Sequence, residues 1–553
     1  FIPADKILDA QDGDKVFVRI TEWKDMDSNP QGELLRVLGK KGVHNVEMES
    51  IVLEKGFDTR FPPAVDEEAE RVAGEAHKHF DEEVKKRKDF RNTTTFTIDP
   101  IDAKDFDDAI SFKKLPDGDY EIGVHIADVS YFVTEGSVLD DEARKRGFSV
   151  YLVDRTIPML PEILSNDMCS LNPREDKFAF SSVFVMDSQG TVKDRWFGKT
   201  IINSDKRFTY ENAQAVLTAG SLTGAKELDG GEYFEQLHTL NTIAKIFQKY
   251  RFEHGAIDFE TEEVKFELDE AGVPIAVYRK ERMDTHKLVE EFMLLANREV
   301  ATFIYNAHGK SKIPKAFIYR IHDVPDPDKI GDLTTFLKAL GYELQSKNGA
   351  TTSKDISLML KSITGSPAEF LIKTATVRSM AKAVYSTKNI GHFGLGFEFY
   401  THFTSPIRRY ADLIVHRLLE RHLTGGKVEQ NEFAKYERIA RDTTEKEIAA
   451  AEAERASVKY KQVEYMSTRM NKVFEGTISG MSEWGIYVEE KESRSEGVIK
   501  IRDMKDDFYE LDQKNYALIG SRTGKKYSLG DKITFKITNA DLDRKILDYV
   551  LVN

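Results

Sequence analysis

Five aspartates within ten positions constrain this sequence more than any other feature: Asp99, Asp102, Asp105, Asp107 and Asp108. Before them, Phe96 and Ile98 alternate with threonines, which predicts a strand with Asp99 at the end of its polar face. Pro100 then prevents a central strand from continuing. Like charges ~4 Å apart repel by several kcal/mol at an intermediate effective dielectric, so a fold that gathers these carboxylates is expected to bind a cation.

The chemistry of these side chains indicates which cation. Carboxylates without His or Cys among them are hard oxygen ligands, which favour Mg²⁺, Mn²⁺ or Ca²⁺ over zinc or copper. An EF-hand loop starting at Asp105 would need glycine at Ile110 and glutamate at Pro116, so the sequence favours Mg²⁺ over Ca²⁺. Mg²⁺ held by a few carboxylates serves phosphoryl transfer or phosphodiester hydrolysis. The alternative interpretation is a solvated acidic loop.

Two arginines form a second candidate site. Arg408 and Arg409 precede a helical run from Ile414 to Leu423, and guanidinium groups can bind phosphate through two hydrogen bonds. The alternative interpretation of such a pair is a surface ion pair. The segment Gly520–Lys525 is one residue too short for a nucleotide P-loop, and nothing in the sequence indicates ATP or NAD.

Composition limits the class of protein. A single cysteine, Cys169, excludes an intrachain disulfide and every zinc site built from several cysteines, and it favours a reducing, cytoplasmic setting. The net charge of −14 argues against a protein that coats nucleic acid by bulk charge, but it leaves a local groove open. Apolar runs fall far short of the roughly 18 residues of a spanning helix, so no membrane partner is expected. The first residue is Phe1 rather than Met, which favours a trimmed product.

Changes in pattern divide the 553 residues into four segments. Residues 1–53 alternate like the strands of a small barrel, which could be incomplete, and residues 54–90 form a charged connecting helical segment. Residues 91–470 mix helix and strand patterns and end in a long charged helix. Residues 471–553 return to short strands separated by glycine, which predicts a second barrel whose aromatic residues could stack on bases.

The motifs along the core resemble the ribonuclease II and ribonuclease R family, whose catalytic module is the RNB domain. The match is ordered and includes Thr97-Ile98-Asp99, Asp107-Asp108-Ala109-Ile110, His125-Ile126-Ala127-Asp128, Ile157-Pro158-Met159-Leu160-Pro161, Val289-Glu290-Glu291-Phe292, His392-Phe393-Gly394 and Thr404-Ser405-Pro406-Ile407-Arg408-Arg409-Tyr410. The run Arg409-Tyr410-Ala411-Asp412 is more similar to the ribonuclease R branch than to the ribonuclease II branch.

The resemblance implies an α+β fold, in which a large mixed α/β RNB catalytic domain at 91–470 is flanked by small all-β OB-fold barrels. The barrel at 1–53 would be of the cold-shock type and the barrel at 471–553 of the ribosomal-protein type. It also implies a processive, Mg²⁺-dependent 3′-to-5′ exoribonuclease that hydrolyses single-stranded RNA, and structured RNA with a 3′ overhang, to nucleoside 5′-monophosphates. RNA 3′ ends, and possible ribosome or RNA-decay proteins, are the expected partners of a cytoplasmic monomer.

By resemblance, the site residues can be named one by one. Asp107 and Arg408 match the catalytic aspartate and the arginine that contacts the scissile phosphate. Tyr151 matches an aromatic that stacks on the terminal base, Phe259 the opposing aromatic of the stack, and Glu291 an acidic residue near the terminal nucleotide. The metal-binding carboxylates match Asp99, Asp105, Asp107 and Asp108.

Two other classes of function stay open. One is a non-catalytic RNA-binding or RNA-remodelling protein that has kept the RNB shell, and the other is endonucleolytic or DNA-directed cleavage. The intact carboxylates and Arg408 weigh against the first, because a binding module has no reason to hold several unrelieved charges together.

Overall fold

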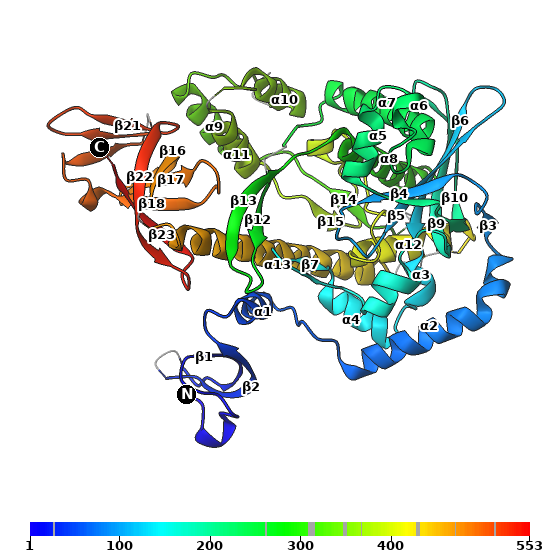
Figure 1. The fold of residues 1–553 in the computed structure, drawn as a ribbon, viewed down its shortest axis with the longest axis horizontal. Helices are drawn as coiled ribbons and strands as arrows, with labels where there is room; N and C mark the ends of the chain where they lie inside the picture. The colour runs from blue at the N-terminus through cyan, green and yellow to red at the C-terminus, as the bar shows by residue number, and fades with distance from the viewer. Residues whose placement is uncertain are drawn as a thin grey trace.

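The computed structural model describes residues 1–25, 28–259, 263–307, 316–346, 351–366, 368–426, 432–470, 472–513 and 516–552. A small N-terminal unit leads into a large core of mixed helices and strands, and the chain ends in a β-barrel (Figure 1). This arrangement confirms the predicted α+β class. None of the helices in the described part of the chain combines the length and apolar character that crossing a bilayer requires.

The N-terminal unit is one antiparallel strand pair and a helix. Strand β1 (Asp14–Glu22) pairs with β2 (Gln31–Lys40), and α1 (His44–Glu54) packs against both. Among the residues that the structure describes here, the predicted barrel is not closed, because two strands leave two sheet edges without a neighbouring strand. The apolar side chains of β1 consequently stay on the surface, and Ile20 is 57% exposed.

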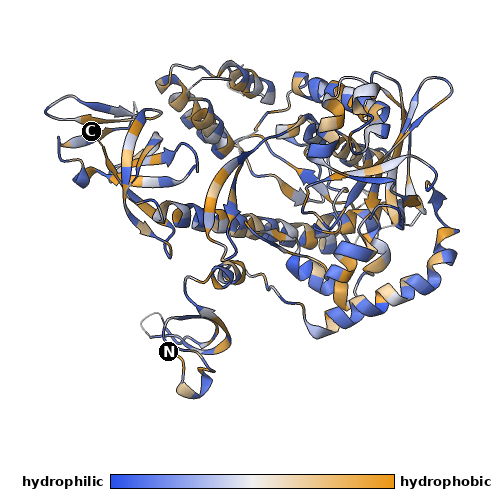
Figure 2. Ribbon diagram, viewed as in Figure 1, coloured by the Kyte–Doolittle hydropathy of each residue, from blue (hydrophilic) through white to orange (hydrophobic). Residues whose placement is uncertain are grey.

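A long helix connects this unit to the core. Helix α2 (Pro63–Val84) carries proline at its first position, where a missing backbone N–H costs no helical hydrogen bond. Figure 2 shows α2 banded in polar and apolar colours. Its core-facing side buries residues three or four positions apart: Val65, Ala69, Ala73 and Ala76.

The core is built on a seven-stranded sheet with both faces covered. Thr95 and Thr97 were expected on a polar face, but they are as buried as Phe96 and Ile98, since helix α5 (Tyr210–Thr218) packs against this part of the sheet. The two outermost pairings, β11 with β4 and β10 with β3, are parallel. In spatial order the strands are β11 (Lys206–Thr209), β4 (Thr95–Asp99), β5 (Asp108–Lys114), β6 (Tyr120–Ala127), β9 (Asp176–Met186), β10 (Val192–Asn203) and β3 (Lys88–Asp89).

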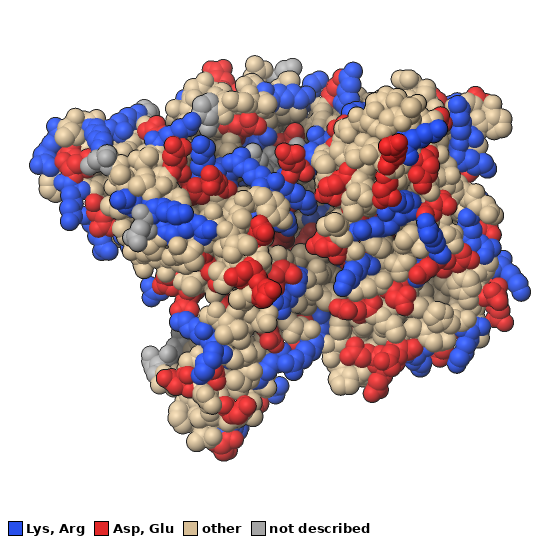
Figure 3. Space-filling view, viewed as in Figure 1, with Lys and Arg blue, Asp and Glu red and all other residues tan. Residues whose placement is uncertain are grey.

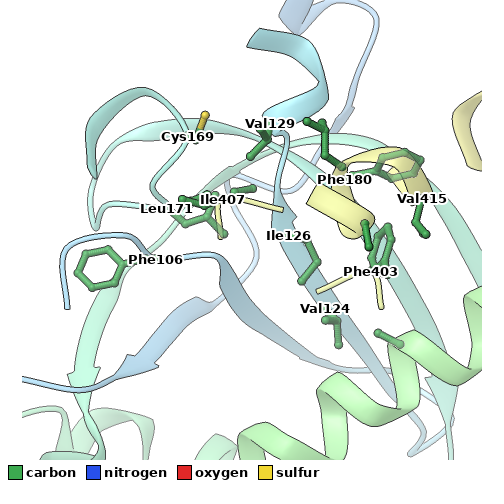
Figure 4. Packing of buried hydrophobic residues seen from close by; sticks show 14 of the residues in the cluster. Phe106, Val124, Ile126, Val129, Cys169, Leu171, Phe180, Phe403, Ile407 and Val415 are labelled. Atoms are coloured by element: carbon green, nitrogen blue, oxygen red, sulfur yellow. The ribbon is translucent and has the colours of Figure 1, made fainter. Parts of the chain in front are cut away.

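Three long helices complete the core: α8 (Asp284–Asn306), α12 (Tyr410–Leu423) and α13 (Glu432–Ser467). Figure 4 shows apolar side chains of β6, β9 and α12 meeting in one cluster that includes Phe180 and Phe403, whose ring centroids are 5.6 Å apart. The core also contains α3 (Val129–Phe132), α4 (Val138–Arg146), β7 (Val150–Tyr151), β8 (Thr156–Ile157), α6 (Leu222–Ala225), α7 (Phe234–Glu253), β12 (Glu263–Leu268), β13 (Pro274–Lys280), β14 (Tyr319–Ile321), α9 (Pro327–Ala339), α10 (Ser353–Ser362), α11 (Glu369–Ser379) and β15 (Val384–Ser386).

The C-terminal unit is a closed five-stranded barrel that α13 joins to the core (Figure 1). Its strands are β16 (Val473–Ser482), β17 (Gly485–Glu490), β18 (Glu496–Lys500), β23 (Ile546–Leu551) and β22 (Lys532–Asp541), and a second sheet of β19 (Tyr509–Asp512), β20 (Ala517–Gly520) and β21 (Lys526–Ser528) is inserted after β18. Of the aromatic residues expected to stack on bases, Trp484 and Phe508 are 79% and 71% exposed, whereas Tyr509 is buried. Residues 471 and 553, the ends of the predicted C-terminal domain, lie outside the described residues.

Candidate active site

The acidic loop joins β4 to β5 and gathers four of the five aspartates at one end of the sheet. Strand β4 ends at Asp99, and β5 begins at Asp108. Phe106 anchors the loop, because its backbone N–H donates to Ser170 Oγ (2.9 Å) and its carbonyl accepts from the N–H of Leu171 (3.0 Å). Asp102 is the exception, since its side chain is exposed to solvent.

The four gathered carboxyl groups all have raised pKa values. Burial raises the pKa of Asp105, Asp107 and Asp108, and it raises the pKa of Asp99 together with the charge of Asp108. One carboxylate oxygen of Asp99 and one of Asp107 are buried without a hydrogen-bond partner. The positive charge near these carboxylates is therefore too small to stabilise all of them in their ionised form.

The segment before α12 supplies the first cation to this cluster. Arg408 Nε lies 3.6 Å from Asp107 Oδ2, and the backbone N–H of Ile407 donates to Asp107 Oδ1 at 2.9 Å. Arg408 is 38% exposed and also donates to Ser405 Oγ (2.9 Å). Its position at the surface end of the cluster leaves the guanidinium accessible to a phosphate.

Arg409 has a different role from Arg408. Its guanidinium forms two hydrogen bonds to the fully buried Asp412, at 2.7 and 2.9 Å. Asp412 also accepts the backbone N–H of Ser405 (2.8 Å). Arg408 therefore lies at the site, whereas Arg409 holds the segment that carries it. Of the two arginines considered for phosphate binding, Arg408 is the one whose guanidinium stays accessible.

Tyr151 lies at the same end of the sheet. The charges that act on its hydroxyl include those of Arg408, Asp105 and Asp107, and burial raises its pKa so that the hydroxyl stays protonated. Its strand, β7, follows residues that are tied to the Arg408 segment: the N–H of Ser149 donates to the carbonyl of Arg408 at 3.0 Å. The structure therefore brings Tyr151, Arg408 and the four aspartates together.

Glu291 and Phe259 are placed elsewhere in the core. Glu291 is buried on α8 and accepts two hydrogen bonds from Arg251 of α7, at 2.5 and 3.1 Å. Phe259 belongs to a separate apolar cluster and lies beside Gly394, where an added Cβ would be 3.6 Å from its ring. Within the described residues, no ring contact joins Phe259 to Tyr151, and Arg251, the cation paired with Glu291, forms no ion pair with the aspartate cluster.

The sequence patterns did not indicate two residues that lie near the cluster, Tyr210 and Arg207. Burial and the charges of Asp108 and Asp99 raise the pKa of Tyr210. The ring of Tyr210 stacks on His286, with ring centroids 3.8 Å apart. Arg207 donates to the carbonyls of Pro100 and Ile101 in the acidic loop, at 2.5 and 2.9 Å. Arg207 lies on β11 and Tyr210 is the first residue of α5. The parallel pairing of Thr209 with Asp99 brings both residues to the site. Thr209 is a recognisable helix N-cap, but no local signal predicts this long-range pairing.

The four carboxylates fit a hard divalent cation by donor chemistry and by their unpaired buried oxygens. In the described part of the chain, however, no group of three or more His, Cys, Asp or Glu side chains is arranged so that it could hold a metal ion by itself. Oxygen ligands from outside the protein, such as a phosphate, would have to complete the coordination sphere. Figure 3 shows Lys and Arg interspersed with Asp and Glu over the visible face, which has a recess near its middle.

Comparison with known proteins gives an independent view. Residues 87–425 match the RNB domain and residues 1–62 match a cold shock domain. The chain is 37% identical to ribonuclease R of Aquifex aeolicus over 98% of its own length and 75% of the relative, and 33% identical to ribonuclease R of Escherichia coli over 100% and 68%.

Solved structures agree with these sequence matches. RNase R of Mycoplasma genitalium in complex with ribose methylated single-stranded RNA has a TM-score of 0.89 at 30% identity, covering 100% of this chain and 85% of that chain. The complex of the same protein with double-stranded RNA has a TM-score of 0.84 at 28% identity, covering 100% and 91%. Yeast Ssd1, a pseudonuclease, shares the fold at 20% identity, with a TM-score of 0.72 over 93% of this chain and 63% of that chain. The fold alone therefore does not establish catalysis.

Proposed function

The chain belongs to the RNB-domain ribonuclease family, on its ribonuclease R branch, and we propose that the Asp107 cluster is its metal-assisted hydrolytic centre. The protein is a 3′-to-5′ exoribonuclease, and RNA is its partner. The observation that carries the proposal is the shared contact of Asp107 with Ile407 and Arg408, because it places a buried, incompletely paired carboxylate next to an accessible guanidinium.

We propose Mg²⁺ as the cofactor, held by Asp99, Asp105, Asp107 and Asp108. Such an ion would supply an activated water and neutralise the charge that develops on the leaving oxygen. The chain itself orients the carboxylates: Phe106 anchors the loop, and Arg207 fixes the loop carbonyls at Pro100 and Ile101.

The remaining residues would bind the RNA end. Arg408 would pair with the scissile phosphate, where its charge stabilises the transition state, and the protonated, partly exposed Tyr151 would stack on the terminal base. We keep Phe259 as the opposing side of the stack and Glu291 as an acidic neighbour of the terminal nucleotide. The Arg251 pair would keep Glu291 fixed, because the guanidinium satisfies one of its oxygens twice.

The rest of the assignment is also a proposal. The domains would be 1–53, 54–90, 91–470 and 471–553, as the sequence predicts, with RNA bound by the N-terminal unit and the C-terminal barrel. We propose a cytoplasmic setting, which fits a chain whose one cysteine, Cys169, is buried and unpaired. We also propose that the protein is a monomer. Ribosome and RNA-decay proteins stay predicted partners.

Direction and substrate can be tested with three matched nucleic acids. Linear RNA with a free 3′ end, the same RNA closed into a circle and single-stranded DNA of the same sequence are incubated with protein and Mg²⁺. The proposal expects loss of the linear RNA alone, with release of nucleoside 5′-monophosphates. Cleavage of the circle would indicate an endonuclease, and equal loss of DNA would contradict the RNA-specific assignment. Binding without any cleavage would favour the RNA-binding alternative.

A further inference from the structure

The hairpin that carries Tyr151 is held on its active-site side by the Arg408 segment. The N–H of Ser149 donates to the carbonyl of Arg408 (3.0 Å), and Phe148 forms an antiparallel bridge with Arg409. Strand β7 then pairs with β8 through Tyr151 and Thr156. The approach to Tyr151 is therefore fixed to the segment that carries the phosphate-binding arginine.

The N-terminal unit holds the turn at the other end of this hairpin. His44 Nε2 donates to Asp154 Oδ2 at 2.8 Å, and Arg155 Nη2 donates to Asn45 Oδ1 at 2.5 Å. The side chains of His44 and Asp154 are both mostly shielded from water, so their attraction is screened less than that of a surface pair. Burial raises the pKa of Asp154, but the hydrogen bonds from His44 and Arg155 outweigh it and bring the pKa down to about 2.

His44 is itself firmly seated against the core. Gly272, in the turn between β12 and β13, has φ +78°, and a Cβ atom there would lie 2.3 Å from the His44 ring. The carbonyl of Gly272 accepts from Lys461 Nζ at 2.6 Å, and Lys461 is fully buried on α13. The imidazole thus lies between the Asp154 turn and a hairpin turn that is bonded to α13.

We propose that Asp154 is a positioning residue for Tyr151, and that His44 of the N-terminal unit holds Asp154 in this role. The inference rests on the proposed function, in which Tyr151 stacks on the terminal base. The connection is short: the turn is residues 152–155, closed by the N–H of Leu152 donating to the carbonyl of Arg155 at 2.8 Å. A displacement of Asp154 is therefore carried directly to the strand that holds the tyrosine, and small displacements of substrate-positioning groups are costly in rate.

Steady-state kinetics on a short single-stranded RNA test this role in the full chain. Asp154→Asn and His44→Ala should each lower kcat/KM about 10-fold. His44→Gln keeps a side-chain N–H donor for Asp154 and should retain more activity than His44→Ala. The matched control is Lys41→Ala, which breaks the ion pair of the same unit with Asp543 of the C-terminal barrel (2.5 Å) and should leave kcat/KM unchanged.

A double-mutant cycle separates positioning from a general loss of structure. If Asp154 acts through Tyr151, Asp154→Asn should cause no further loss in a Tyr151→Ala background, whereas a merely structural role would lower kcat/KM by the same factor in both backgrounds. Additive losses, or an Asp154→Asn variant as active as Lys41→Ala, would overturn this proposal alone. An unaltered protein that shortens no RNA would overturn the proposed function and this inference with it.

Discussion

Arg408 Nε lies 3.6 Å from Asp107 Oδ2, and this contact joins two parts of the catalytic core that are far apart in sequence. The neighbouring N–H of Ile407 holds the other oxygen of the same carboxylate. One segment therefore fixes the acidic loop and presents the arginine beside it. The position of Arg408 relative to the carboxylates is set by the backbone, so the two groups should fail together when this segment is disturbed.

The division between the two arginines should be measurable. Arg408→Ala should lower kcat/KM about 100- to 1000-fold with little change in Tm, because it removes charge stabilisation at a partly exposed position. Arg409→Ala should instead lower the free energy of unfolding by about 3–5 kcal/mol, because it leaves the buried Asp412 unpaired. Kinetics and thermal melts on both variants decide this, and equal losses of Tm would contradict it.

The acidic cluster should make the metal-free protein less stable. Burial raises the pKa of Asp107, so the ionised carboxylate is disfavoured in the folded state. The stability of the metal-free protein therefore falls as the pH rises above the ordinary pKa of an aspartate. In EDTA at pH 8, Asp107→Asn should therefore be more stable than the unaltered protein by on the order of 1 kcal/mol. Mg²⁺ should raise the Tm of the unaltered protein more than that of the variant.

The exposed Asp102 is the control for this prediction. Asp102→Asn removes a charge from the same loop at a position outside the cluster, so it should change neither the Tm in EDTA nor the response to Mg²⁺. An equal Mg²⁺ response in all three proteins would show that the ion does not bind at Asp107.

A buried ion network around Asp128 predicts that stability falls as the pH is lowered, which is opposite to the dependence expected for Asp107. Asp128 pairs with Arg87 (2.8 Å) and Lys199 (2.6 Å), and although burial raises its pKa, the two cations hold that pKa well below its ordinary value. Asp128→Asn should cost about 3–5 kcal/mol at pH 7. The contribution of Asp128 is complete above an unfolded-state pKa of about 3.9 and is lost as pH falls below it.

Chemical denaturation at pH 7 and pH 3 checks this prediction. The difference between the unaltered protein and Asp128→Asn should narrow at pH 3. Asp81→Asn on the exposed side of α2 serves as the control and should match the unaltered protein at both values. A difference that does not change with pH would contradict the assignment.

Stacking by Tyr151 should depend on the ring rather than the hydroxyl. Tyr151→Phe should retain most activity, whereas Tyr151→Ala should weaken binding of a short RNA by about 1–3 kcal/mol, the usual range for one stacked base. Steady-state kinetics that determine KM and kcat separately measure this, and the change is expected in KM. Tyr278→Ala, at an exposed position of β13, is the control. Equal losses for Tyr151→Phe and Tyr151→Ala would indicate that the hydroxyl is what matters.

The exposed aromatics of the C-terminal barrel should affect long RNA only. Trp484→Ala combined with Phe508→Ala removes two rings that face solvent and should raise KM for a long single strand, with kcat unchanged. A short oligonucleotide should show no difference between the variant and the unaltered protein. A lower kcat on the short substrate would contradict a role confined to binding.

The sequence predicted the parts of the site that are local along the chain. The strand before Asp99, its end at Pro100 and the turn bearing the other aspartates follow from alternation and from the chemistry of proline. The division of roles between Arg408 and Arg409 was not predictable, because it depends on Asp412 being buried beside one of them.

Long-range pairing explains the other differences. Alternation predicted a polar face for Thr95 and Thr97, but a strand covered on both faces buries all of its side chains. Tyr210 and Arg207 reach the site only through the parallel pairing of β11 with β4. Residues 1–53 have the pattern of a barrel, yet a pattern of alternation does not fix how many strands close the sheet.

The central claim is that Asp107 serves metal-assisted hydrolysis, and one gel tests it most directly. A 5′-labelled single-stranded RNA with a free 3′ end is incubated with the unaltered protein and with Asp107→Asn, in Mg²⁺ and in EDTA. The account predicts Mg²⁺-dependent shortening to a very short 5′ product, which Asp107→Asn abolishes without loss of RNA binding. Binding without cleavage by the unaltered protein under any divalent cation, or undiminished cleavage by Asp107→Asn, would contradict it.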